Sequence, residues 1–129
     1  MEANLTGKWV FFPWIHNQGL NDLIHPDYLA GLEGKGIGLA FCLSDEGDYL
    51  VMRNKDLIFL GKKEGVKSIK PAPAFTWNQK VSILKKPDLN AIVNDFFWHF
   101  KDDRYYFLLQ VGNKPDKRRY GADKLAAVQ

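Results

Sequence analysis

The sequence has few of the features that stabilise secreted or membrane proteins. Its single cysteine, Cys42, excludes an intramolecular disulfide, and the apolar neighbours of Cys42 indicate a small buried side chain rather than a reactive thiol. No hydrophobic run approaches the ~20 residues that a membrane helix requires. Neither the basic start nor the apolar core of a signal peptide is present in the first residues, MEANLTGKW. We therefore expect a cytoplasmic protein with no membrane partner.

Motifs for metal binding and catalysis are also missing. No histidine or cysteine pair has a ligand spacing such as HxxxH or CxxC, so we predict neither a metal nor a cofactor. There is no GxSxG nucleophile motif, and GKGIG at residues 34–38 lacks the spacing of a phosphate-binding loop. An enzyme is therefore disfavoured, and we assign no catalytic residue.

Two histidine–aspartate combinations remain available for general acid–base chemistry. His25 has Asp22 and Asp27 close by in the sequence, and His99 lies near Asp95 and the acidic KDDR turn. The plainer interpretation is structural: His25 caps or packs a loop, and His99 ends a strand beside an acidic hairpin. A small hydrolase or isomerase is accordingly the third of three functional hypotheses.

The composition is that of a packed globular protein. The 129 residues are 46% hydrophobic and 14% aromatic, enough for one ordinary domain or two very small ones. The net charge of +3 is too small to indicate a nucleic-acid or membrane partner. It conceals an asymmetry, because residues 1–65 carry a net charge of −3 and residues 66–129 carry +6. The two halves therefore offer different surfaces.

The first half predicts a strand meander. Trp9–Ile15 is β-branched and aromatic, but Pro13 restricts it to an edge strand or to one that breaks at Pro13. Residues 27–32 have room for one helical turn. Two apolar runs, residues 37–43 and 49–53, flank SDEGD and predict a hairpin, and residues 57–60 add a third strand. A short strand at 66–70 precedes PAPAF, a stiff connector at which we place a domain boundary, giving units 1–72 and 73–129.

The second half predicts four strands and a helical turn. We expect strands at residues 75–84, 91–100, 105–111 and 117–120, with turns at 85–90, 101–104 and 112–117. Alternation of apolar and polar residues fails near Asn94 and Asp95, where a β-bulge would restore it and bend the strand. Residues 121–125 predict a single helical turn before a frayed end.

Each half thus has a turn-rich entry, a long strand, an acidic turn and a strand that begins with tyrosine. Residues 80–83, 91–100, 105–111 and 119–125 resemble the small Src-homology-3-like barrels of the Tudor and KOW kind. The first half resembles them more weakly, through DLIHPDYL and SDEGDYLVM. At the entry turn, the Gly-Asp pair common in these barrels is replaced by Asn78-Gln79. The whole chain is also similar to an uncharacterised bacterial family with IHPD and WHFKD-type signatures.

The resemblance implies a mainly β protein of two tandem small antiparallel β-barrels with short helical turns. Such barrels bind proteins, peptides or nucleic acids, and the fold alone does not decide among them.

Seven of the eighteen aromatic residues lie between Phe96 and Phe107. Small barrels fill their cores with aromatic side chains, so core packing is the main interpretation for this cluster. Trp98 and Tyr106 are the best candidates for rings that face a ligand, because polar positions adjoin them on strands that a bulge could turn outward.

A basic segment follows the aromatic one. Lys114, Lys117, Arg118 and Arg119 precede Tyr120, a composition typical of a strand that contacts phosphate, although a solvated surface strand has the same composition. With Trp98 and Tyr106, these five residues form the predicted binding edge.

The leading functional hypothesis is a non-catalytic binding or adaptor module that recognises a protein or peptide, with an immunity-like role as one form of it. The alternative is RNA or DNA binding through the basic second barrel. The residues leave the oligomeric state open.

Overall fold

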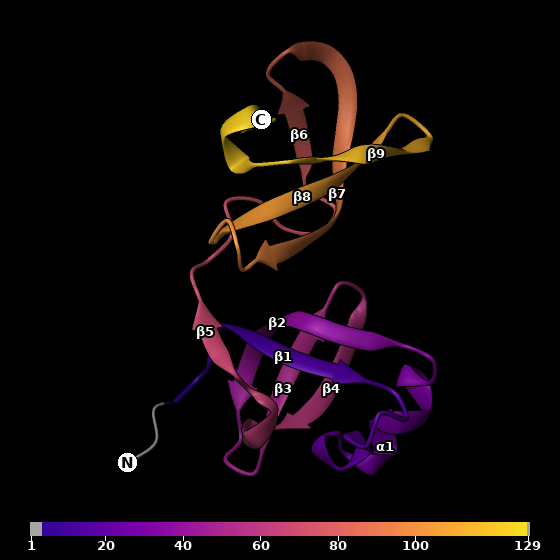
Figure 1. Ribbon diagram of the computed structural model, residues 1–129, viewed down its shortest axis with the longest axis vertical. Helices are drawn as coiled ribbons and strands as arrows, with labels where there is room; N and C mark the ends of the chain where they lie inside the picture. Colours follow the sequence, from indigo (N-terminus) through magenta and orange to yellow (C-terminus); the bar gives the residue numbers. More distant parts are fainter. Residues whose placement is uncertain (1–3, 129) are drawn as a thin grey trace. The chain divides into compact units, whose positions relative to one another are not determined.

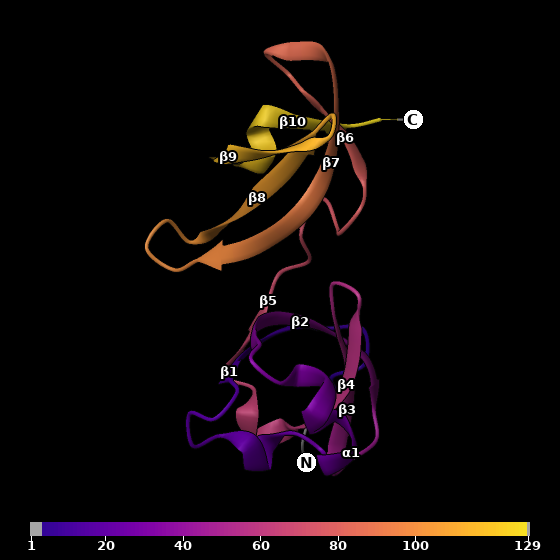
Figure 2. The same ribbon diagram turned by 90° about the vertical axis from the view of Figure 1, so that its right-hand side faces the viewer.

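The computed structural model describes residues 4–128, and the chain divides into two compact units, Met1–Ala72 and Pro73–Gln129. Each unit contains one five-stranded antiparallel sheet, so the chain is mainly β, as predicted. The strand order is β4-β3-β2-β1-β5 in the first sheet (Figure 1) and β10-β6-β7-β8-β9 in the second (Figure 2). In both sheets the first four strands form a meander, and the last strand returns to pair with the first.

The elements of the first unit are β1 (Trp9–Ile15), η1 (Asn21–Leu23), α1 (Pro26–Leu29), η2 (Ala30–Leu32), β2 (Gly36–Asp45), β3 (Tyr49–Asn54), β4 (Leu57–Lys62), η3 (Lys63–Gly65) and β5 (Ser68–Lys70). Strand β1 is an interior strand, since it pairs with both β2 and β5. Its pairing with β2 is irregular between Phe11 and Trp14, which places Pro13 where the ladder is interrupted. The strand itself continues through Pro13 to Ile15, so only its ladder with β2 breaks there, and the edge-strand alternative is wrong.

The core of the first unit is apolar and tightly packed around Phe12 and Trp14, both fully buried. The Trp14 indole Nε1 donates to the carbonyl oxygen of Leu20 at 2.9 Å, so the polar atom of this large side chain is paired. Gly61 and Gly65 lie against the Phe12 ring, and a β-carbon built on Gly65 would be 2.3 Å from the ring atom Cε2. Gly65 therefore requires glycine for reasons of space, whereas at Gly61 the nearest atom is the flexible Met52 Cε.

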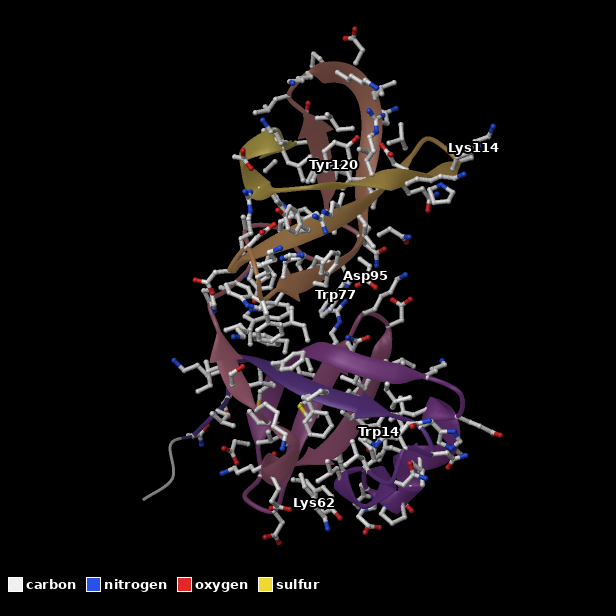
Figure 3. All side chains as sticks on the ribbon, viewed as in Figure 1. Trp14, Lys62, Trp77, Asp95, Lys114 and Tyr120 are labelled. Carbon is white, nitrogen blue, oxygen red and sulfur yellow. The ribbon has the colours of Figure 1, made fainter. Side chains whose placement is uncertain are left out.

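The elements of the second unit are β6 (Lys80–Ile83), β7 (Lys86–His99), β8 (Arg104–Val111), β9 (Lys114–Tyr120), η4 (Ala122–Lys124) and β10 (Leu125–Ala127). The long hairpin of β7 and β8 bends across the unit (Figure 2). Its register shifts between Val93 and Asp95, which confirms the bulge predicted near Asn94 and Asp95. Asp95 accepts hydrogen bonds from the Phe96 backbone N–H and from the Trp77 indole at 3.1 Å (Figure 3).

Several predicted boundaries in this unit are wrong. The strand predicted at 75–84 is confined to Lys80–Ile83, because Asn78 adopts a left-handed φ of 65° and turns the chain before it. Phe75 and Trp77 are instead buried core residues of the entry loop. Asn78 thus takes the left-handed conformation that glycine favours.

The predicted turn at 85–90 is also wrong, because β7 already begins at Lys86. Ile83 pairs with Lys86 and Val81 pairs with Ala91, so residues 87–90 are extended but have no partner on β6. Pro87 tolerates this position because it has no N–H to donate.

At the C-terminal end of the unit, the predicted frayed tail contains strand β10, which pairs with β6 and covers the free edge of that strand. The predicted turn at 112–117 is shorter than expected, since β9 begins at Lys114.

Candidate binding surface on the second unit

The pairing of β7 with β8 places the residues of the predicted binding edge on opposite faces of the sheet. Trp98 is paired with Tyr105, and Phe97 with Tyr106. Successive side chains of a strand point to opposite faces of the sheet. Trp98 therefore lies on the core face, where its ring meets that of the buried Tyr105 at 4.9 Å, whereas Tyr106 lies on the outer face. The prediction that Trp98 and Tyr106 share one outer edge is wrong.

The outer face carries a group of side chains that we call the Tyr106 cluster: Phe97, His99, Asp102, Arg104, Tyr106 and Arg119. The Tyr106 hydroxyl donates to Asp102 Oδ2 at 2.5 Å. The Arg119 guanidinium lies over the Tyr106 ring, with Cζ 4.4 Å from the centroid, and Arg104 Cζ is 5.2 Å away. Both distances are within the range of cation–π attraction. The cluster is therefore held in place by contacts among its own members.

The hydrogen bond between Tyr106 and Asp102 sets the ionisation of both groups. It raises the pKa of Tyr106, because the neutral phenol is the donor, and it lowers the pKa of Asp102, because the carboxylate is the acceptor. Both shifts move the pKa of the group further from neutral pH, so the Tyr106 phenol stays protonated and the Asp102 carboxylate stays charged. This arrangement suits recognition better than proton transfer.

The two histidine–aspartate combinations have structural roles. His99 Nδ1 accepts the backbone N–H of Asp102 at 3.0 Å, and His25 Nδ1 accepts that of Asp27 at 3.1 Å. The neighbouring carboxylates are farther away, with Asp27 Oδ2 3.9 Å from His25 Nδ1 and Asp102 Oδ2 3.6 Å from His99 Nδ1, so each Nδ1 bonds the backbone of the following turn. The expectation that His25 caps a loop and that His99 ends a strand is confirmed.

The basic residues of β9 fall into separate environments. Asp116 lies between Arg118, whose Nε is 3.4 Å from Oδ1, and Tyr120, whose hydroxyl donates to Oδ2 at 2.7 Å. These three residues alternate along the strand and therefore share one side of it. Lys114 and Lys117 are exposed, and no carboxylate of the described residues lies within ion-pair distance of them. Lys114 and Tyr120 stand at opposite ends of β9 (Figure 3).

A groove that the sequence did not predict lies beside the end of β9. It has a volume of about 260 Å³. The side chains that line it come from three segments and include five basic residues and three apolar or aromatic ones: Ile83, Leu84, Lys85, Lys86, Arg118, Arg119, Tyr120 and Lys124. We call it the β9 groove.

Comparison with known proteins places the chain in a family. A family model described as "Family of unknown function (DUF6960)" matches residues 1–126. The chain belongs to this family. No curated protein and no solved structure matches it. Membership in this family therefore brings no activity or ligand to the chain.

The structure adds two further observations on ligands and membranes. Within residues 4–128, no three histidine, cysteine, aspartate or glutamate side chains gather in a way that could hold a metal ion. None of the helices in that range has the length and hydrophobicity that a bilayer crossing demands.

Sequence reasoning missed the groove for an identifiable reason. The local pattern assigns Lys85 and Lys86 to one turn and Lys124 to a helical turn, with no signal that they meet Arg118. Residues 83–86 are far in sequence from residues 118–124, so a local pattern cannot show that they line one groove. Their proximity depends on the pairing of β10 with β6 and of β9 with β8.

Proposed function

We propose that the protein is a non-catalytic binding protein whose second unit recognises a protein or peptide. The observation that carries the proposal is the Tyr106 cluster, a preorganised patch of tyrosine, arginine and phenylalanine on the outer face of a sheet. Tyrosine and arginine are the side chains that most often dominate the energy of protein interfaces, because they combine large contact area with directed polar groups. Asp102 is the one acidic side chain of the cluster and lies beside two arginines, Arg104 and Arg119.

We further propose that both units are Src-homology-3-like modules. The shared strand order supports this, as does a short 3₁₀ turn, η3 or η4, before the last strand of each sheet. In each unit the edge strands have no second strand partner among the described residues, although Ile24 and His25 bond to part of β4, and this leaves a partly open barrel with edges at which a partner chain could be added.

The test is affinity capture of the full chain from cell lysate at physiological salt. Tyr106→Ala combined with Arg119→Ala should abolish recovery of a protein that the unmodified chain retains, because both substitutions remove contact area that is already in place. Lys35→Ala, an exposed position in the first unit, is the matched control. Failure to recover any protein with the unmodified chain would contradict the proposal.

Nucleic-acid binding is the second candidate, favoured by the exposed Lys114 and Lys117 beside Arg119. If it holds, affinity for an oligonucleotide should fall steeply with salt and disappear when Lys117, Arg118 and Arg119 are all neutralised. Affinity that is independent of salt would exclude it.

A further inference from the structure

The β9 groove combines positive charge with apolar lining. It is lined by five basic side chains and by none that is acidic. Its lining is nevertheless largely apolar, since Ile83, Leu84 and the Tyr120 ring contribute to it. Leu84 is 55% exposed, so its side chain is accessible to an apolar group of a ligand. The groove therefore offers apolar contact and positive charge at the same place.

The charges around the groove are only partly neutralised. Asp116 contacts Arg118, and Asp123 lies 3.9 Å from Lys124 while also pairing with Arg104 at 2.6 Å. Within the described residues, Lys85 and Lys86 have no carboxylate at ion-pair distance. The groove therefore retains an excess of positive charge, located mainly at its β6–β7 rim.

The backbone beside the groove is open to a further strand except at the Arg118 N–H, which donates to Asp116 Oδ1 at 2.9 Å. Within the described sheet, β9 pairs with β8 alone, so the second edge of Arg118–Tyr120 has no strand partner. An extended segment laid along this edge could form main-chain hydrogen bonds while it places alternate side chains in the groove.

We propose that the β9 groove binds a short acidic peptide segment that inserts one apolar side chain against Leu84 and Tyr120. This inference rests on the proposed function and specifies the chemistry of its partner. Carboxylates of the segment pair with Lys85, Lys86 and Lys124, and the volume of about 260 Å³ accommodates a single aliphatic or aromatic side chain.

A nucleic acid is disfavoured as the occupant. A phosphate backbone requires a continuous basic track, whereas Asp116 and Asp123 lie beside the groove and interrupt it. Phosphate contacts would not cover the apolar lining of the groove. An apolar side chain of a peptide would cover it, and the burial of apolar surface is favourable.

The experiment selects short random peptides displayed on phage against the full chain and measures an enriched peptide, made synthetically, by fluorescence anisotropy. Enriched peptides should contain several acidic residues around one apolar residue. Leu84→Ser should weaken binding at least about tenfold, because the anchor loses its apolar contact. Lys85→Glu combined with Lys86→Glu should do the same. Both positions are exposed, so the fold should survive.

The control is Lys67→Glu combined with Lys80→Glu, which changes the net charge equally at two exposed positions outside the groove and should leave binding unchanged. Chemical-shift mapping with the same peptide should show the largest changes at residues 84–86 and 118–124.

Each other outcome is informative. Peptide binding that survives the groove variants but is lost with Tyr106→Ala overturns the groove and leaves the proposed function standing. Binding of an oligouridylate that depends on Lys85 and Lys86 but not on Leu84 makes the groove a phosphate site and also overturns the inference. If no peptide is enriched, the inference fails, and lysate capture decides separately whether the proposed function fails with it.

Discussion

At the scale of single residues, buried or half-buried polar groups determine where the chain is sensitive to substitution. Asp45 is the clearest case in the first unit. Its side chain is 3% exposed, and it accepts the backbone N–H groups of Leu5 and Gly47 and pairs with Lys63 Nζ at 2.9 Å. These bonds, the one from Leu5 foremost, lower the pKa of Asp45. A single carboxylate thereby ties the N-terminal segment to the β2–β3 hairpin.

The lowered pKa of Asp45 predicts a specific pH dependence. Since the folded protein binds this proton less tightly than the unfolded chain, the contribution of Asp45 to stability is complete above the unfolded pKa of about 4 and is lost as the pH falls through the folded pKa. Asp45→Asn should be less stable than the unmodified chain at neutral pH, and the difference should shrink below about pH 4. Urea denaturation at several pH values measures this. A difference that is constant with pH would contradict it.

A second prediction concerns the contact of Gly65 with Phe12. Gly65→Ala should destabilise the protein by about 1–3 kcal/mol, because the new methyl group overlaps a fully buried ring that has no free space to move. Gly31→Ala is the matched control, since Gly31 also lies in a 3₁₀ turn but has nothing within 4 Å of the added carbon. Thermal or chemical denaturation of both variants provides the comparison, and equal stabilities would refute the steric argument.

At the scale of secondary-structure elements, the β7 bulge is the feature that shapes the second unit. The extra residue at the bulge changes the alternation, so that Val93 and Phe96 both face the core. Asp95 is thereby turned so that its carboxylate accepts from the Trp77 indole, whose ring packs 4.7 Å from Phe96. The bulge thus also fixes the entry loop.

Substitution of Asp95 should loosen the connection between the β7 bulge and the entry loop that carries Trp77. Asp95→Ala removes the acceptor for both Trp77 and the Phe96 N–H and should cost about 1–3 kcal/mol of stability. Asp95→Asn should cost much less, because the amide oxygen can still accept. The near-ultraviolet circular dichroism of Trp77 should weaken in the alanine variant only. Equal effects of alanine and asparagine would show that the hydrogen bonds are unimportant.

At the scale of the whole molecule, each of the two units has its own sheet and its own buried side chains. We therefore expect residues 1–72 and 73–129, produced separately, each to give the dispersed amide spectrum of a folded protein. The second fragment should be the less stable one, because a shorter chain buries a smaller fraction of its surface. A fragment with a collapsed spectrum would indicate that its fold depends on the rest of the chain.

Local patterns were sufficient to predict the class of fold, the SDEGD hairpin, the bulge near Asp95 and the structural roles of His25 and His99. These features depend on residues that are close in sequence, where turn composition and alternation act directly. Local patterns did not predict where β7 begins or that the C-terminal residues form strand β10. Strand β10 forms because β6 would otherwise have an edge of unpaired backbone groups, which no local pattern records.

The amino-acid sequence by itself determined a mainly β protein without a disulfide, a metal motif or a catalytic motif. Only the tertiary structure decided which side each candidate residue faces. Trp98 and Tyr106 lie on opposite faces because one bulge resets the alternation of β7, and Arg118 and Lys85 line the same groove because segments distant in sequence converge. Both outcomes follow from pairing between strands, in which a shift of one residue exchanges the inner and outer faces of the sheet.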